Sequence, residues 1–267
     1  MKRINALTIA GTDPSGGAGI QADLKTFSAL RAYGTSVITA LVAQNTLGVQ
    51  AICAVDPQFV SAQLDSVLND VRIDTSKIGM LANESIVRIV SEKLRDNSLG
   101  FVVLDTVMLA KSGDPLLPLT AVEAIKQYLL PQVSLVTPNM PEAAILLDCP
   151  IAKNEKQMCE QGQRLLDLGC KNVLIKGGHL NSDESPDWLF TSEGGEYRFA
   201  CARVKTRHTH GTGCTLSAAL AALRPRHDNW QDSVQIAKDY LQQALLQADS
   251  LEVGKGIGPV HHFHHWW

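Results

Sequence analysis

The chain has 267 residues, of which 45% are hydrophobic and 19% are charged, and its formal net charge is −3. This composition is ordinary for a globular protein, too apolar for a disordered one, and not basic enough for a general nucleic-acid or anionic-membrane partner. No apolar run reaches the roughly 18 to 20 residues that a membrane-spanning helix needs. We therefore expect a soluble, cytoplasmic protein that binds neither nucleic acid nor membrane.

The first predicted element is a strand over residues 4–10, after a basic start. A signal peptide begins in a similar way, but this apolar stretch is short, and Asp13 follows it without a convincing small-residue cleavage site. A buried strand is the better interpretation. The glycine-rich segment 11–19 comes next and leads into a predicted helix over 19–33. It lacks the GxGxxG spacing of a dinucleotide-binding loop and by itself indicates little.

Apolar runs and amphipathic stretches alternate over most of the chain and predict strands and helices in turn. The predicted strands are 4–10, 36–43, 74–79, 101–105, 133–136 and 172–177, and the predicted helices are 19–33, 57–70, 83–97, 119–130, 140–147 and 155–168. Such alternation indicates a three-layer α/β fold with a mainly parallel central sheet flanked by helices on both faces. Because neither a repeat nor a linker interrupts the pattern, we predict a single domain over residues 1–267.

The alternating pattern then gives way to a hairpin and two helices. Residues 187–191 and 196–200 flank a Gly-Gly pair and predict two antiparallel strands at the edge of the sheet. The helices are predicted over 213–223 and 230–249. Pro225 ends the first of them, because proline cannot continue a helix.

Neither the cysteines nor the histidine-rich tail gives a metal or disulfide framework. The six cysteines contain no CxxC pair, so reduced thiols are the natural interpretation. The tail, residues 261–267, has four histidines but no thiol or acid beside them, so zinc binding is a minor alternative. Trp266 and Trp267 indicate that the end of the chain docks on the body of the protein or on a partner subunit. His208 and His210 are expected to shape their loop through hydrogen bonds.

The sharpest chemical signal is His-Gly-Thr-Gly-Cys-Thr at residues 210–215, ahead of a helix rich in Leu and Ala. Glycines let successive backbone N–H groups point at one spot, and the helix N-terminus adds positive potential. Together they predict a cradle for a phosphoryl group. The alternative is a loop that only caps the helix. The chain has no GxxxxGK[ST], so it is not a P-loop nucleotide hydrolase.

Polar and glycine-rich clusters follow the carboxyl ends of the predicted strands, where ligands bind in open α/β sheets. They comprise residues 11–19, 44–45, 79–80, 105–108, 137–142 and 176–179. We expect these clusters to form one site.

Six blocks of the chain resemble, in order, the signature blocks of the hydroxymethylpyrimidine (phosphate) kinases, which belong to the ribokinase superfamily. The blocks are residues 10–23, 42–46, 105–108, 137–143, 176–179 and 211–215. The resemblance covers essentially the whole chain and implies a ribokinase-like kinase of thiamine biosynthesis that uses ATP and Mg²⁺. It implies two successive phosphorylations of a small-molecule substrate, the pyrimidine precursor of thiamine, and a homodimer. One departure is Thr106, where many relatives have proline, so the local turn is expected to differ.

The resemblance assigns the metal site to Asp105, Asn139 and Glu142. Mg²⁺ prefers one or two carboxylates and several retained waters as ligands, so the carboxylates of Asp105 and Glu142 are a suitable pair. Without the resemblance, Glu142 would be read as an acid that complements a helix dipole. Lys176, followed by Gly177, is expected to neutralise charge on the transferring phosphoryl group. The alternative for Lys176 is an exposed lysine at a strand end.

Cys214 stands where many ribokinase-type sugar kinases have an aspartate that takes the proton of the attacking hydroxyl. The pyrimidine kinases and some pyridoxal kinases also have cysteine there. Because a helix N-terminus lowers the pKa of a thiol, we expect a thiolate that deprotonates the hydroxymethyl group. The alternative is a small thiol packed under the loop. The resemblance assigns catalysis to Lys176, Gly211, Gly213 and Cys214, and ATP binding to Lys176, Gly177, Thr212 and Gly213.

Substrate recognition is expected from the earlier segments of the chain. Gln44 can pair with a ring nitrogen and an exocyclic amine. Met80 and Val107 are expected to sandwich the flat ring, with ordinary core packing as the alternative. The resemblance adds Gly11 and Asp23, and the alternative for Asp23 is an exposed acid on a helix.

Two other functions stay open from the sequence. Pyridoxal kinase is the closer one, since pyridoxal also carries a hydroxymethyl group on a flat nitrogen heterocycle. A non-catalytic sensor of nucleotide or pyrimidine would use the same pocket, although the set Glu142, Lys176 and Cys214 speaks against it.

Overall fold

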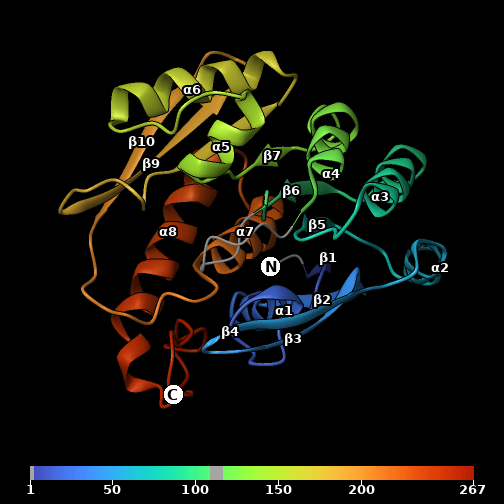
Figure 1. Cartoon of the computed structure of the whole chain (residues 1–267), viewed down its shortest axis with the longest axis horizontal. Helices are drawn as coiled ribbons and strands as arrows, with labels where there is room; N and C mark the ends of the chain where they lie inside the picture. The colour runs from blue at the N-terminus through green and yellow to red at the C-terminus, as the bar shows by residue number, and fades with distance from the viewer. Residues whose placement is uncertain (1–2, 109–116) are drawn as a thin grey trace.

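A computed structural model describes residues 3–108 and 117–267 and has an eight-stranded sheet at its centre (Figure 1). The strand order is β10-β9-β8-β7-β6-β5-β1-β2. The strands are β1 (Ile4–Ala10), β2 (Ala32–Ile38), β5 (Thr75–Ile78), β6 (Phe101–Leu104), β7 (Leu135–Val136), β8 (Asn172–Lys176), β9 (Glu184–Thr191) and β10 (Glu196–Ala202). The first six of these are parallel, and β9 and β10 form the antiparallel hairpin at one edge. The predicted fold class and edge hairpin are confirmed.

Helices cover both faces of this sheet (Figure 1). One face carries α1 (Gly19–Ala29), α7 (Thr212–Leu223) and α8 (Trp230–Leu246). The other carries α2 (Pro57–Leu68), α3 (Glu84–Asp96), α4 (Leu119–Ala124), α5 (Met140–Leu147) and α6 (Glu155–Asp167). A π-helical turn, Ile125–Leu129, continues α4, and short 3₁₀ turns at Arg224–Arg226 and Ala248–Ser250 follow α7 and α8.

Helix α7 is the central element for the site. Every residue from 215 to 223 is buried, because the helix lies on the sheet and between α1 and α8. A helix that is apolar all round is stable only when it is enclosed in this way. The head of α7 is therefore held against the carboxyl ends of the strands by a large apolar surface.

The prediction of one strand over 36–43 is wrong. The chain bends at Thr39, whose N–H donates to the Ala10 carbonyl at 3.0 Å and whose hydroxyl donates to the Met80 carbonyl at 2.6 Å. Residues before the bend form β2, and those after it form β3 (Ala40–Asn45), which leaves the main sheet. Because the apolar run continues across Thr39, the sequence pattern hides this break.

Strand β3 pairs with β4 (Gly48–Ala54), a strand that the sequence pattern did not indicate. They make an antiparallel ribbon separate from the main sheet (Figure 1). Along β3, the side chains of Ala40, Val42 and Gln44 are buried or half-buried, and those between them are exposed. Strand β4 is exposed along most of its length, so it lacks the apolar alternation by which a half-buried strand is recognised.

The C-terminal tail docks on the body of the protein. The Ile257 N–H donates to the Thr46 carbonyl at 2.9 Å, and the His261 N–H donates to the Ala244 carbonyl at 2.9 Å. The hydroxyl of Tyr240 donates to the His262 carbonyl at 2.6 Å. In Figure 1 the tail lies between the end of α8 and the β3–β4 ribbon. Docking was expected through the two terminal tryptophans, but the buried side chains are those of His261 and His262.

No helix in the described part of the chain is both long and apolar enough to cross a bilayer. Within residues 3–108 and 117–267, no three His, Cys, Asp or Glu side chains gather closely enough to hold a metal ion by themselves. The histidine-rich tail therefore offers no protein-only zinc site in this region.

Candidate active site

Two charged side chains meet at the head of α7, namely Asp105, which follows β6, and Lys176, which ends β8; these strands lie on either side of β7. The Lys176 ammonium lies 3.0 Å from Asp105 Oδ1, and the Ser217 hydroxyl donates to Asp105 Oδ2 at 3.3 Å. A Cβ atom on Gly213 would lie 3.5 Å from Lys176 Nζ and 3.6 Å from Asp105 Oδ2. The structure thus brings together predicted residues from three separate segments, at the carboxyl edge of the sheet.

The loop before α7 packs directly on the first glycine-rich segment. Gly211 has a φ of 79°, and a Cβ atom there would lie 1.7 Å from the Gly17 carbonyl oxygen, so only glycine fits. The Thr215 N–H donates to the Gly211 carbonyl at 2.8 Å and starts the helical hydrogen bonding. The N–H groups of residues 212–214 belong to the first turn, where a helix supplies no acceptor of its own. Helix N-termini are common positions for anion binding, so the predicted role of this loop stays a prediction that its position allows.

Glu142 is fixed by the start of α5. Its Oε2 atom accepts the Asn139 N–H at 2.8 Å and the Thr106 hydroxyl at 3.0 Å, while Asn139 Oδ1 accepts the Glu142 N–H at 2.9 Å. The first and third of these bonds form a capping box. The Asn139 side chain is therefore engaged as a helix cap that orients Glu142. Thr106, the departure noted in the sequence, contributes its hydroxyl to the same carboxylate.

In this buried cluster, attraction between opposite charges keeps Asp105 and Lys176 ionised. Burial by itself would raise the pKa of Asp105, but attraction from Lys176 and then Lys77 outweighs it and holds that pKa below its usual value. Burial would lower the pKa of Lys176, but attraction from Asp105 and Glu142 raises it. For Glu142, burial raises the pKa, and Lys176 opposes the rise. Asp105 and Lys176 therefore stay ionised as a pair.

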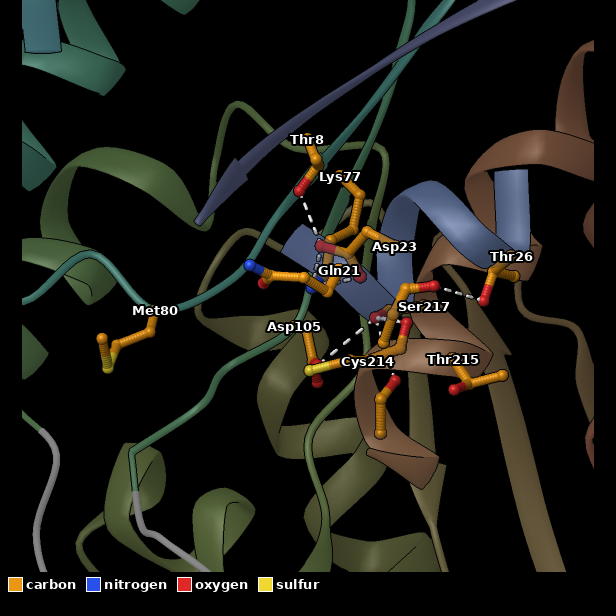
Figure 2. Close-up of polar contacts among 12 residues, drawn as sticks. Thr8, Gln21, Asp23, Thr26, Lys77, Met80, Asp105, Cys214, Thr215 and Ser217 are labelled. Carbon is orange, nitrogen blue, oxygen red and sulfur yellow. Dashed lines mark hydrogen bonds and ion pairs between the residues drawn. The ribbon is translucent and has the colours of Figure 1, made fainter. Parts of the chain in front are cut away.

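Cys214 lies in the first turn of α7, beside this cluster (Figure 2). Burial raises the pKa of its thiol to about 11, and the nearby Lys77 ammonium opposes the rise only in part. The expectation that the helix N-terminus makes Cys214 a thiolate is therefore wrong, because the thiol form is favoured at neutral pH. Desolvation of the charged sulfur outweighs the favourable field.

Asp23 and Lys77 form an ion pair inside the protein rather than an open contact site (Figure 2). Both side chains are fully buried, the Lys77 ammonium lies 2.9 Å from each Asp23 oxygen, and the Thr8 hydroxyl donates to the same carboxylate at 2.6 Å. Neither the predicted substrate contact nor the alternative of an exposed acid fits Asp23. Lys77 was missed, although a lysine within the short buried strand β5 is an unusual feature that points to a partner.

Three predicted substrate residues gather on the inner side of the β3–β4 ribbon. A Cβ atom on Gly11 would lie 2.6 Å from Met80 Cε, and Met80 packs with Val42 and Val107 in one small apolar cluster. Gln44, half-buried on β3, lies farther along the ribbon with its Nε2 atom 3.1 Å from His210 Nε2. Gly11, Met80 and Val107 therefore lie together beside β3, Gln44 lies farther along the same strand, and Asp23 belongs to neither place.

Asp13 organises the glycine-rich segment and was not singled out from the sequence. Its Oδ1 atom accepts the Ser15 N–H at 2.9 Å, and its Oδ2 atom accepts the Ala18 N–H at 2.8 Å and lies 2.7 Å from His210 Nε2. Burial would raise the pKa of Asp13, but the hydrogen bonds from His210 and Ser15 lower it to about 2. The available signal was an aspartate in a Pro- and Gly-rich turn, a position where the side chain often accepts backbone N–H groups.

Gly177, next to Lys176, is tied to a third buried ion pair. The Gly177 N–H donates to Asp187 Oδ1 at 3.0 Å, and Asp187 Oδ2 lies 2.6 Å from the Lys238 ammonium of α8. A Cβ atom on Gly177 would lie 2.0 Å from the Pro186 carbonyl oxygen, so this position also requires glycine. These contacts fix the backbone that carries Lys176. His208 accepts the Gly258 N–H through Nδ1 at 2.9 Å, so both loop histidines make the hydrogen bonds expected of them.

The sequence matches the profile of the family described as phosphomethylpyrimidine kinase over residues 13–261. A hydroxymethylpyrimidine/phosphomethylpyrimidine kinase of Escherichia coli is 70% identical over 267 residues, which is all of both chains. The structure is similar to that of a pyridoxal kinase from Staphylococcus aureus in complex with AMP-PCP and pyridoxal, with 30% identity and a TM-score of 0.90 over 100% of this chain and 96% of that one. A phosphomethylpyrimidine kinase from Clostridium difficile gives 38% identity and a TM-score of 0.80 over 91% of this chain and 100% of that one.

Proposed function

The chain belongs to the phosphomethylpyrimidine kinase family, and we propose that it transfers the γ-phosphoryl group of ATP first to hydroxymethylpyrimidine and then to the resulting monophosphate. Such a kinase acts in thiamine biosynthesis. The observation that carries the proposal is the meeting of Gly213, Lys176 and Asp105 at the head of α7. Phosphoryl transfer is catalysed by positioning and charge neutralisation, and this arrangement offers both.

We place the ATP site at the head of α7 as well. Thr212 and Gly213 present first-turn N–H groups, and Lys176 with Gly177 stands opposite them. The Lys176 side chain is 14% exposed, so its charge is held in a low-dielectric environment without being fully enclosed. It would neutralise charge as the phosphoryl group moves, while Gly211 and Gly213 allow close backbone approach.

Mg²⁺ fits the acids of this site. Asp105 and Glu142 both lie close enough to Lys176 to shift its pKa, and two carboxylates with retained waters are a usual magnesium set. They would hold the ion, while Asn139 acts through Glu142, because its side-chain oxygen is already the cap of α5. When bound, Mg²⁺ supplies charge neutralisation to the phosphate oxygens.

Cys214 is proposed to take the proton of the hydroxymethyl group in the first transfer. Because its pKa is raised to about 11, the thiolate fraction is small at neutral pH and grows as the pH rises. The monophosphate is already mostly a dianion at neutral pH, since its second pKa is near 6, and needs no base. The two transfers should therefore depend differently on Cys214.

The remaining proposals concern organisation. We expect one domain over residues 1–267, a cytoplasmic location and a homodimer. We place the homodimer contact at the β3–β4 ribbon, where Leu47 in the turn is 73% exposed and Leu41 and Ile52, on the two faces of the ribbon, are 53% and 43% exposed. Leu47→Lys should lower the mass measured by light scattering to that of a monomer.

The decisive experiment is an ADP-release assay with hydroxymethylpyrimidine, its monophosphate and pyridoxal as acceptors. We expect turnover with both pyrimidines. The similarity to pyridoxal kinase structures makes pyridoxal the acceptor to compare, and a higher efficiency with pyridoxal than with the pyrimidines would reverse the assignment. Absence of ADP release with every acceptor, with tight nucleotide binding retained, would indicate a sensor instead.

A further inference from the structure

His210 joins three segments that are far apart in the sequence. Its Nε2 atom lies 2.7 Å from Asp13 Oδ2 in the glycine-rich segment and 3.1 Å from Gln44 Nε2 on β3. The residue after it is Gly211. It begins the loop of residues 211–214 that is proposed to hold the phosphoryl group, called the phosphate loop below. One imidazole nitrogen thus links the proposed substrate end of the site to its phosphoryl end.

The position of this ring is strongly constrained. The His210 N–H donates to the Gly258 carbonyl at 3.0 Å, and His210 forms an isolated β-bridge with Pro259 of the tail. A Cβ atom on Gly17 would lie 2.5 Å from His210 Cδ2, so the ring packs on the backbone of the glycine-rich segment. The side chain is 14% exposed. His210 therefore cannot turn away from Gln44 without moving the loop or the tail.

The contact with Asp13 decides where the imidazole proton lies. The Asp13 side chain is 2% exposed and ionised above pH about 2, and it also accepts the Gly17 and Ala18 N–H groups. A carboxylate oxygen at 2.7 Å requires a proton on His210 Nε2. A protonated ring nitrogen has no lone pair, so it cannot accept from an amide NH₂ group.

This proton in turn selects one orientation of the Gln44 amide. With the amide nitrogen next to His210, two donors would face each other. A half-turn exchanges amide nitrogen and oxygen at almost no steric cost and places Oε1 beside the ring N–H. The main acceptor of this N–H is Asp13 Oδ2 at 2.7 Å, and Oε1 becomes the second, weaker acceptor of a three-centre hydrogen bond. The oxygen then lies on the side of His210 and the phosphate loop, and the NH₂ group lies on the far side.

We propose that His210 is a specificity-determining positioning residue that fixes the Gln44 amide with its oxygen toward the phosphate loop, and that this orientation selects an aminopyrimidine over a pyridine. The inference rests on the proposed function. In hydroxymethylpyrimidine, the exocyclic amine is on the ring carbon next to the one that bears the hydroxymethyl group, and a ring nitrogen comes after it. The substrate therefore offers a donor near the reacting centre and an acceptor farther away, which matches the fixed amide.

Pyridoxal offers the opposite order beside its hydroxymethyl group. The aldehyde oxygen, an acceptor, comes first, and the ring hydroxyl follows. Against the fixed amide, the aldehyde oxygen would face the Gln44 oxygen, and two acceptors would be desolvated without a bond. An amide that is free to turn would accept either substrate, because it would rotate to match each one.

The test is the ratio of kcat/KM for hydroxymethylpyrimidine to kcat/KM for pyridoxal in His210→Phe, which keeps a ring but has no proton to donate. We expect the ratio to fall on the order of tenfold, the size expected from one lost discriminating hydrogen bond, mainly through a higher KM for the pyrimidine. If the His210→Phe variant does not fold, His210→Ala can be measured in its place. Thermal melting of each variant confirms folding.

Two controls separate this role from loop shaping. His208→Phe removes the other loop histidine, which bonds to the Gly258 N–H but not to Gln44, and should leave the ratio unchanged. In a Gln44→Leu background, His210→Phe should have no further effect on the ratio. An unchanged ratio in folded His210 variants, an equal fall in His208→Phe, or an effect that persists without Gln44 would each overturn the inference. A wild-type protein that phosphorylates no pyrimidine would instead overturn the proposed function.

Discussion

The two ends of the candidate site are built in different ways. At the phosphoryl end, Asp105 and Lys176 lie at the carboxyl ends of β6 and β8, on either side of β7 in the main sheet, and are buried with their charges paired. At the substrate end, Gln44 lies on a two-stranded ribbon that is mostly exposed and separate from that sheet. The ribbon is held by Thr39, by the tail at Thr46 and by His210.

The comparison shows which contacts suit charge neutralisation and which suit substrate recognition. Charge neutralisation works best where water is excluded and where the groups do not need to reorganise, and a buried sheet edge provides this. Recognition of a small heterocycle depends instead on the direction of a few hydrogen bonds, and a ribbon pinned by loop and tail contacts supplies these. Four predictions test this contrast, from the largest expected effect to the smallest.

Lys176→Met should have the largest effect, because it removes the cation that faces the phosphate loop. We expect kcat to fall on the order of a thousandfold with both pyrimidine acceptors, as for the loss of a principal electrostatic contact in phosphoryl transfer. The measurement is steady-state ADP release. Lys171→Met is the matched control, since this lysine is exposed just before the same strand and should keep full activity. A fall of less than tenfold in Lys176→Met would remove the lysine from the mechanism.

Lys77→Met should mainly cost stability. The change leaves the Asp23 carboxylate fully buried without its cation, and breaking a buried pair in this way costs about 3–5 kcal/mol. Urea unfolding gives the free energy. Lys93→Met breaks a pair with the half-exposed Asp65 and should cost less than about 1 kcal/mol. Equal losses in the two variants would mean that burial of the first pair has no energetic consequence.

Cys214→Ala should slow the first transfer about a hundredfold and the second by no more than about threefold, because only the alcohol needs a base. In the wild type, the first transfer should accelerate between about pH 7 and 9, as the thiolate fraction rises toward the pKa of about 11. The variant should lose this dependence. Rapid-quench measurement of each transfer checks both points, and equal losses in the two transfers would show that Cys214 acts through loop geometry.

Asp13→Asn should have the smallest effect. It should lower the free energy of unfolding, and only at pH values above the acid range. The carboxyl pKa is 3.8 in the unfolded reference and about 2 in the folded protein. Since the folded pKa is depressed, the stabilisation is present in full above pH about 4 and is lost as the pH falls toward 2. It amounts to about 2 kcal/mol. Unfolding free energies of wild type and variant should therefore differ at neutral pH and converge near pH 2, and a constant difference would contradict the assignment.

The sequence determined the parts of the protein that follow from local pattern. Alternating apolar runs gave the parallel sheet and its helices, and the Gly-Gly pair gave the edge hairpin that became β9 and β10. The glycine loop at residues 211–213 was also recognisable, because a left-handed turn before an apolar helix has a local signature. Strand β4 and the break at Thr39 were missed, since their positions depend on packing and not on periodicity.

Only the tertiary structure decided the chemistry of particular side chains. Asp23 and Lys77 are 54 residues apart, and Asp13 and His210 are 197 residues apart, so no local pattern could pair them. The protonation of Cys214 was decided in the same way, because its helix position favours a thiolate while burial among distant residues opposes it more strongly. Backbone preferences act over a few residues, whereas desolvation and charge act across whatever the fold brings together.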